Sequence, residues 1–415
     1  MRKLPAYKLY LGIQASFWMF FSMMSMISAI YRVQSAGLDP LQLVLVGTVL
    51  EATVFIFEIP TGIVADIYSR RLSAVIGYFL IGLGFMLEGA IPLFGTILLA
   101  QVIWGLGATF QSGAEEAWLA DEIGEENLAN AYLRGSQLGQ IGTVVGIFLS
   151  VMLGRVALNL PILLGGFLIV CLAVVLAFFM PEDGFEPTPM PDRNTYQKMV
   201  ATFKGGIDLI RGRRLLMIIM GIGLIYGLAS EGIDRLWEAH FLANFEFPTV
   251  GHLDTVTWFG IINLVQMILV VLATEVVRRR VRVEEQIAAV RALILINTVV
   301  VLGLVAFGLV QSFALAVAAV WTVFVFRRTG APLFSAWLNK NVESSVRATV
   351  ISTRGQLDAL GQLVGGPVIG FVALQFGLRA AMVGVGLMLV PALLLYGQAL
   401  RITRKSTASE KSAPA

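Results

Sequence analysis

Charged side chains interrupt the apolar runs of this 415-residue sequence at helical spacing, which makes them candidate functional groups. Glu231, Asp234 and Arg235 fall within one such run, and Arg327 and Arg328 fall within another. A carboxyl group that loses hydration becomes able to take up and release a proton, whereas an arginine keeps its charge. We therefore predict that Glu231 and Asp234 form a proton-sensitive pair with Arg327. A permanent structural ion pair is the alternative interpretation.

Other apolar runs carry acids as well. A charge at bilayer depth is costly unless it faces a cavity or a partner, so these acids suggest a cavity. Seven residues separate Glu51 from Glu58, which places both on one helical face. Arg354 and Asp358, at i and i+4, instead predict a helix-stabilising ion pair. The candidate proton-coupling and cavity charges are Glu51, Glu58, Glu115, Glu116, Glu231, Asp234, Arg235, Arg327 and Arg328.

Uncharged polar and aromatic side chains in the same runs could form an amphiphilic substrate pocket. Each aromatic residue could equally pack against lipid or a neighbouring helix. The candidate pocket residues are Gln101, Trp104, Gln111, Trp118, Gln137, Gln140, Trp237, Phe324 and Gln362.

The composition excludes most soluble classes. Hydrophobic residues make up 57% of the chain without glycine, and charged residues only 14%, against about 25% in soluble domains. A net charge of +3 is too small to indicate a nucleic-acid partner. One cysteine and two histidines exclude a disulfide within the chain and argue against a metal site. No nucleophile, base and orienting group converge either, so we expect neither a cofactor nor an enzyme.

The apolar runs predict an all-α membrane protein, since about 20 apolar residues cross a bilayer. Residues 181–213 form the one long connection, which begins as a proline-rich linker and could continue as an amphipathic helix from Asn194. The linker separates two six-helix bundles, 1–180 and 214–402, and a disordered tail follows at 403–415. The twelve predicted spans lie near 9–33, 41–65, 72–92, 95–120, 131–154, 159–180, 215–243, 251–276, 287–309, 312–338, 348–375 and 379–401.

Basic residues predict the orientation of these spans. Of the 30 lysines and arginines, 24 lie on the side that holds both termini and four near the other side. Loops rich in Lys and Arg stay in the cytoplasm. We therefore expect a multi-pass protein of the cytoplasmic membrane with both termini in the cytoplasm.

A motif lies between the second and third predicted spans, where residues 62–71 read Gly-Ile-Val-Ala-Asp-Ile-Tyr-Ser-Arg-Arg. It resembles the G-x-x-x-D-x-x-x-R-R/K signature of the major facilitator superfamily, in the loop where that family carries it. The resemblance implies a conformational latch, in which the glycine permits close helix approach and an arginine meets an acid at the inner end of the fourth span. The latch residues would be Gly62, Asp66, Arg70, Arg71 and Asp121. Glu275, with Arg279 and Arg280 at the same offsets, is similar to a degraded second copy.

The family resemblance covers residues 8–402 and implies two pseudo-symmetric bundles whose first, fourth, seventh and tenth spans line a central cavity. Stretches 58–62 and 112–118 look like bacterial drug-efflux members, although Gln101 replaces a family arginine and the fifth span lacks a Gly-Pro pair. We therefore predict a monomeric, proton-coupled exporter of a small amphiphilic molecule, with a weak preference for cationic or zwitterionic cargo. Proton-symport uptake of a nutrient, and a receptor or scaffold that transports nothing, remain as alternatives.

Overall fold

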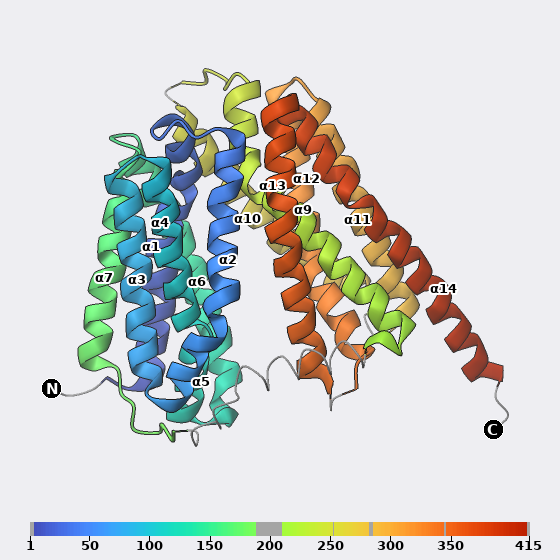
Figure 1. Cartoon of the computed structure of the whole chain (residues 1–415), viewed down its shortest axis with the longest axis horizontal. Coiled ribbons are helices and arrows are strands. Elements are labelled where there is room, and N and C mark those ends of the chain that lie inside the picture. Colours follow the sequence, from blue (N-terminus) through green and yellow to red (C-terminus); the bar gives the residue numbers. More distant parts are fainter. Residues whose placement is uncertain (1–3, 188–209, 252, 282–284, 344–345, 413–415) are drawn as a thin grey trace. The chain divides into compact units, whose positions relative to one another are not determined.

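The computed structural model describes residues 4–187, 210–251, 253–281, 285–343 and 346–412. Within these ranges the chain is helical and contains no strand. It divides into two compact units (Figure 1): Met1–Asp192 with Thr249–Leu264, and Arg193–Pro248 with Val265–Ala415. The boundary near Asp192 falls within the linker expected at 181–213. The amphipathic helix expected from Asn194 lies outside the described residues.

The first unit consists of the helices of the N-terminal half. Asp39 caps the second of them, because its carboxylate accepts a hydrogen bond from the Gln42 backbone N–H at 2.8 Å. The helices are α1 (Ala6–Gln34), α2 (Pro40–Ile67), α3 (Arg70–Ala90), α4 (Phe94–Gln111), α5 (Ala114–Ile123), α6 (Glu125–Gly154) and α7 (Leu160–Phe179).

The second unit holds the helices of the C-terminal half, apart from the start of α10, which belongs to the first unit. Its last helix extends beyond residue 402, so the tail expected to be disordered from 403 is helical as far as Ser412. The helices are α9 (Arg214–Asn244), α10 (Thr255–Arg280), α11 (Gln286–Leu309), α12 (Phe313–Lys340), α13 (Arg347–Met388) and α14 (Val390–Ser412).

Eleven helical segments in the described part of the chain are long and apolar enough to cross a membrane. The last of them, Thr349–Lys405, has 57 residues. A straight helix of that length would measure about 86 Å, far more than one crossing needs. Gly377 interrupts it with a φ of 86°, a left-handed conformation that favours glycine. The segment therefore forms two spans, which gives the twelve that the sequence predicts.

The fourth predicted span, 95–120, is not one continuous helix. It breaks between α4 and α5, where Gly113 has a φ of 70°. Glu115 and Glu116 then lie in the first turn of α5, where the helix dipole favours acidic side chains. Hydropathy averaged over a window hides this break, and the break fixes the position of Glu115.

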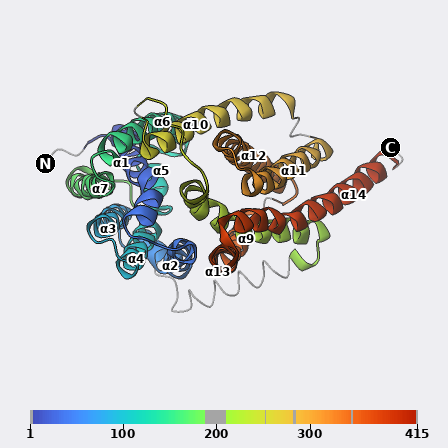
Figure 2. The same cartoon turned by 90° about the horizontal axis from the view of Figure 1, so that it is seen from above.

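Within each unit, equivalent helices pack against one another (Figure 2). In the first unit, α1 packs against α6 and α7, and α3 packs against α4 and α7. In the second unit, α9 packs against α13 and α14, and α11 packs against α12, α13 and α14. Counted as spans, the first pairs with the fifth as the seventh pairs with the eleventh. The two halves are therefore pseudo-symmetric, as the equal halves of the sequence suggest.

Candidate functional site

A cavity of about 220 Å³ lies within the second unit and is lined by α9, α11, α12 and α13. Its wall combines apolar and polar surface, as small-molecule sites generally do. Of the residues that the sequence singled out for function, the wall includes Asp234, Arg327 and Gln362. Four charged side chains contribute to it: Asp234, Arg327, Arg354 and Asp358.

Asp234 and Arg327 join α9 to α12 across this cavity. The two guanidinium nitrogens of Arg327 donate to the two carboxylate oxygens of Asp234 at 2.5 and 2.8 Å. The side chains are 41% and 33% exposed, so water reaches the pair. The predicted contact between these two residues is therefore present and borders a cavity.

Glu231 does not join this pair, contrary to the prediction. Its carboxylate accepts a hydrogen bond from Arg235 Nε at 3.2 Å, one turn along the same helix, and the residue is 3% exposed. Residues at i and i+4 share a helix face, so the nearer arginine satisfies Glu231 first. Arg328 is exposed on α12 and does not line the cavity. The charges predicted to share this cavity therefore lie in different places: Asp234 and Arg327 line the cavity, whereas Glu231 bonds to Arg235 on its own helix.

The predicted ion pair between Arg354 and Asp358 is absent from the described contacts. The Asp358 carboxylate accepts a hydrogen bond from Gln362 Nε2 at 2.9 Å. The guanidinium carbon of Arg354 lies 4.7 Å from the centre of the Phe334 ring, a cation–π contact. Within the described part of the chain, Arg354 makes no hydrogen bond, and its Nε is buried.

A tyrosine cluster adjoins the cavity. The Tyr226 hydroxyl donates to Asn297 Oδ1 at 2.6 Å and lies 2.8 Å from the hydroxyl of Tyr396. Tyr226 and Asn297 both line the cavity, whereas Tyr396 is fully buried. The hydroxyls and the amide hold one another, so this part of the wall is fixed and polar.

Glu115 forms a separate polar site in the first unit, where it is 4% exposed. Its carboxylate accepts hydrogen bonds from Gln14 Nε2, at 2.8 Å, and from the hydroxyl of Tyr78. Gln111 Nε2 donates to the same hydroxyl at 2.8 Å. All the described partners are neutral, and a hydroxyl can donate or accept, so this site can hold a carboxyl group in either protonation state.

The other acids of the first unit are more accessible. Glu58 is exposed and accepts a hydrogen bond from the Ser112 hydroxyl at 2.8 Å, beside the break between α4 and α5. Glu116 is exposed, and Glu51 is half-buried on α2. Neither Glu58 nor Glu116 is a described hydrogen-bond partner of Glu115.

The motif at residues 62–71 lies where α2 ends and α3 begins. Arg70 donates to the carboxylate of Asp121 and to the carbonyl of Ala117, the latter at 2.7 Å, so the predicted arginine–acid contact is present. Asp66 is exposed and forms no ion pair with a described residue. The expected close helix approach at Gly62 is wrong, because a Cβ there would meet no heavy atom within 4 Å.

The start of the linker is bonded to this same end of the unit, which sequence reasoning missed. Glu182 accepts hydrogen bonds from the Ser69 hydroxyl at 2.8 Å and the Arg71 backbone N–H at 2.9 Å, at the N-terminus of α3. The Trp118 indole donates to the carbonyl of Pro181 at 2.6 Å. Trp118 therefore anchors the linker and is not a pocket residue. Glu182 lies 111 residues from Arg71 in the sequence, so spacing gave no signal of this contact.

The second copy of the motif forms only local pairs. Glu275 accepts hydrogen bonds from Arg278 Nε at 2.7 Å and from Arg279 Nε at 2.5 Å, both on α10. These pairs are exposed and lie one turn apart, which is typical of a solvated helix end.

A buried ion pair with a third, neutral polar partner in the first unit was also missed. Arg32 donates to both carboxylate oxygens of Glu88, at 2.8 and 2.9 Å, and Gln101 Nε2 donates to Glu88 at 2.9 Å. The three residues are 5%, 1% and 1% exposed, respectively. Gln101 therefore belongs to a packed interface of α1, α3 and α4 and not to a pocket. Arg32 and Glu88 lie far apart in the sequence, so their spacing did not indicate that they form an ion pair.

The remaining pocket candidates lie in two kinds of environment. Trp104 packs among phenylalanines of α1 and α3. Trp237 and Phe324 are buried against each other, with ring centres 5.6 Å apart. Gln137 and Gln140 are exposed on α6. None of these five residues lines the cavity of the second unit.

Comparison of the sequence with known proteins finds a family model and several similar proteins. A family model described as Major Facilitator Superfamily matches residues 9–327. YxaM of Bacillus subtilis (strain 168), named as an uncharacterized MFS-type transporter, is 24% identical over 371 residues, which cover 87% of this chain and 88% of that protein. Macrolide efflux protein A of Streptococcus pyogenes is 26% identical over 117 residues, 28% of this chain and 29% of that protein.

Solved structures show the same fold at low sequence identity. The nucleoside transporter NupG is 12% identical, with a TM-score of 0.73 over 95% of this chain and 99% of its own. A bacterial homolog of the human lysosomal transporter Spinster is 14% identical, with a TM-score of 0.70 over 97% of this chain and 98% of its own.

Proposed function

Since the chain belongs to the major facilitator superfamily and is thus a multi-pass membrane transporter, we propose that it is a proton-coupled exporter of a small amphiphilic organic molecule. Transporters of this architecture work by alternating access between two bundles. The proposal has two parts, the coupling ion and the direction, and different observations support each.

The Asp234–Arg327 pair carries the proton-coupling part. It joins two helices of one unit, and both side chains are reached by water at the edge of a cavity. Protonation of Asp234 would remove the negative charge that holds Arg327, which cannot itself lose its proton. The contact between α9 and α12 would then weaken, which couples proton uptake to helix movement.

Glu115 is a second candidate proton carrier. It is buried among neutral donors, so its protonation would break no ion pair. We assign the coupling step to Asp234 first, because of these two acids only Asp234 joins two helices through an arginine.

Export is favoured by the drug-efflux-like stretches at 58–62 and 112–118 and by the partial similarity to a macrolide efflux protein. The basic residues near the start of α3 and the end of α10 favour a cytoplasmic location for both termini in the inner membrane of a bacterium. We propose that the protein works as a monomer.

Everted membrane vesicles provide the test. Two fluorescent amphiphiles serve as probes, ethidium, which is a cation, and ciprofloxacin, which is a zwitterion at neutral pH. We expect accumulation of at least one probe that stops when a protonophore collapses the gradient. The Asp234→Asn protein should be expressed but should lose this accumulation, whereas Glu126→Gln, a change at an exposed acid, should retain it. Accumulation that persists without the gradient would contradict proton coupling.

Uptake of a nutrient by proton symport is the second candidate function. The fifth span has glycines at 139, 142 and 146 but lacks the proline of the exporter-associated motif, which favours uptake. Right-side-out vesicles separate the two directions: probe accumulation driven by an inward proton gradient would favour symport. A receptor or scaffold predicts that Asp234→Asn leaves its function intact and that no probe moves.

A further inference from the structure

Two of the four charged side chains in the cavity wall, Arg354 and Asp358, form no ion pair with a described residue. Asp234 and Arg327 satisfy one another through two hydrogen bonds. Arg354 and Asp358 lie about 6 Å apart along the axis of α13, yet their described contacts include no ion pair between them. The cavity therefore presents one cationic and one anionic group that a ligand could engage.

Arg354 is held in place by packing and not by an acid. A Cβ on Gly223 of α9 would come within 3.2 Å of Arg354 Cγ, so the missing side chain makes room for the arginine stem. The guanidinium lies over Phe334 at 4.7 Å. An arginine has five N–H donors, and in the described part of the chain none of those of Arg354 is used. Because Arg354 Nε is buried, the four N–H groups on the two terminal nitrogens are the donors that remain for an anionic oxygen.

Asp358 is equally fixed in position. A Cβ on Gly227 of α9 would lie 2.0 Å from the Asp358 carbonyl oxygen, which shows how closely the two helices approach at this residue. Its carboxylate accepts one described hydrogen bond, from Gln362 at 2.9 Å. A carboxylate offers about four acceptor positions, so most of this capacity remains for a ligand.

We propose that the cavity binds a compact zwitterionic amphiphile, with its anionic group on Arg354, its ammonium group on Asp358 and its apolar part against Phe334. This inference rests on the proposed transport function and specifies its substrate class. A ligand with a single charge would cover the opposite wall charge without giving it a partner, which costs free energy. A zwitterion satisfies both charges together.

Three probes that share one phenyl ring test this proposal: L-phenylalanine, a zwitterion; 3-phenylpropionate, an anion; and 2-phenylethylamine, a cation. Their binding to the purified full-length protein in a non-ionic detergent is measured by isothermal titration calorimetry. We expect the Kd of phenylalanine to be at least tenfold lower than that of either singly charged probe. This measurement needs no proton gradient, so its outcome is independent of whether transport is proton-coupled.

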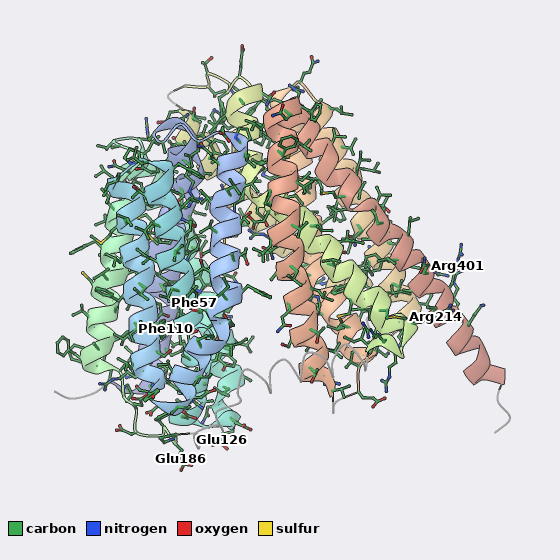
Figure 3. All side chains as sticks on the ribbon, viewed as in Figure 1. Phe57, Phe110, Glu126, Glu186, Arg214 and Arg401 are labelled. Carbon is green, nitrogen blue, oxygen red and sulfur yellow. The ribbon has the colours of Figure 1, made fainter. Side chains whose placement is uncertain are left out.

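Variants test whether Arg354 and Asp358 cause the difference in affinity between the probes. Arg354→Gln and Asp358→Asn should each abolish the tenfold advantage of phenylalanine, and Arg354→Lys should restore part of it. Arg401→Gln, the same change at an exposed arginine of α14 (Figure 3), should leave all three affinities unchanged. Thermal unfolding of each variant separates a lost ligand contact from a misfolded protein. Equal binding of the three probes, no binding of phenylalanine, or an advantage that survives both variants in folded protein would overturn the proposal.

Discussion

Among single residues, Glu88 is a buried acid whose charge requires a partner. It is 1% exposed, and its carboxylate is the described partner of the guanidinium of Arg32, which is 5% exposed. Breaking a buried pair on one side leaves a buried charge and costs about 3–5 kcal/mol. We therefore expect Glu88→Ala to lower the free energy of unfolding by about that amount, measured by thermal and denaturant unfolding in detergent.

The double variant Arg32→Met, Glu88→Leu removes both charges and should recover most of that loss. Glu126→Ala serves as a surface control, because the side chain projects from the start of α6 in the first unit (Figure 3) and is exposed. It should change stability by less than about 0.5 kcal/mol. A Glu88→Ala protein as stable as the wild type would show that the ion pair is not structural.

The residues of the candidate site were only partly predictable from sequence. Asp234 and Arg327 stood out because charges in apolar runs are rare, and the structure joins them. The partner of Glu231 was assigned wrongly, because pairing across helices depends on rotations that spacing cannot give. Arg354 was assigned to Asp358 by its i, i+4 spacing, whereas Phe334, on a different helix, holds it. Spacing thus finds charged residues more reliably than it finds their partners.

At the scale of the helix, Asp254 immediately precedes α10. Its carboxylate accepts hydrogen bonds from the backbone N–H and the hydroxyl of Thr257, at 2.8 and 2.6 Å, and from Arg155 Nε at 3.1 Å. Burial alone would raise the pKa of Asp254, but these bonds outweigh it and hold the pKa below its ordinary value. The stabilisation is therefore full above the unfolded pKa, about 4, and is lost as the pH falls further.

We expect Asp254→Ala to cost about 1 kcal/mol of stability at pH 7, the usual effect of removing an N-cap. The difference from wild type should shrink as the pH falls below about 4, because the unfolded state then takes up a proton, and it should reach its minimum below the lower pKa of the folded state, where Asp254 is protonated in both states. Asp254→Asn keeps a capping side chain without the charge, so it should be milder and lack this pH dependence. A penalty that grows as the pH falls would contradict the assigned role.

Helix packing in the first unit depends on glycines of α6. A Cβ on Gly146 would lie 2.2 Å from the carbonyl oxygen of Met19, so α1 and α6 would have to separate. We expect Gly146→Ala to lower stability by about 1–3 kcal/mol in thermal unfolding. A Cβ on Gly12, on α1, would meet no heavy atom within 4 Å, so Gly12→Ala should be neutral or slightly stabilising. Equal effects of the two changes would argue against close packing at Gly146.

The helices themselves could be predicted from hydropathy because a bilayer requires a fixed apolar length. Two details of these helices could not be predicted from hydropathy. The break before Ala114 depends on the left-handed conformation of Gly113, and a window average conceals one glycine among apolar residues. The extension of α14 to Ser412 lies beyond the apolar run, where hydropathy gives no signal.

At the scale of the whole molecule, equivalent pairs of helices pack against each other in both units. The first and fifth spans approach through Gly146, and the seventh and eleventh approach through Gly365, whose Cβ would lie 2.0 Å from the Leu228 carbonyl oxygen. The equal halves of the sequence predicted this pseudo-symmetry. A further consequence is that each half of the sequence, with six spans, crosses the membrane an even number of times, which predicts that the linker and both termini lie on one side.

This topology can be tested with single cysteines in a Cys171→Ser background, since Cys171 is the one native cysteine. Glu186, exposed after α7 (Figure 3), and Val156, 77% exposed after α6, are separated by one span and must lie on opposite sides. We expect a membrane-impermeant maleimide to label Val156→Cys in intact cells and Glu186→Cys only in everted vesicles. The reverse pattern would place the basic loops outside and contradict the proposed orientation. Labelling of both positions in intact cells would contradict the span between them.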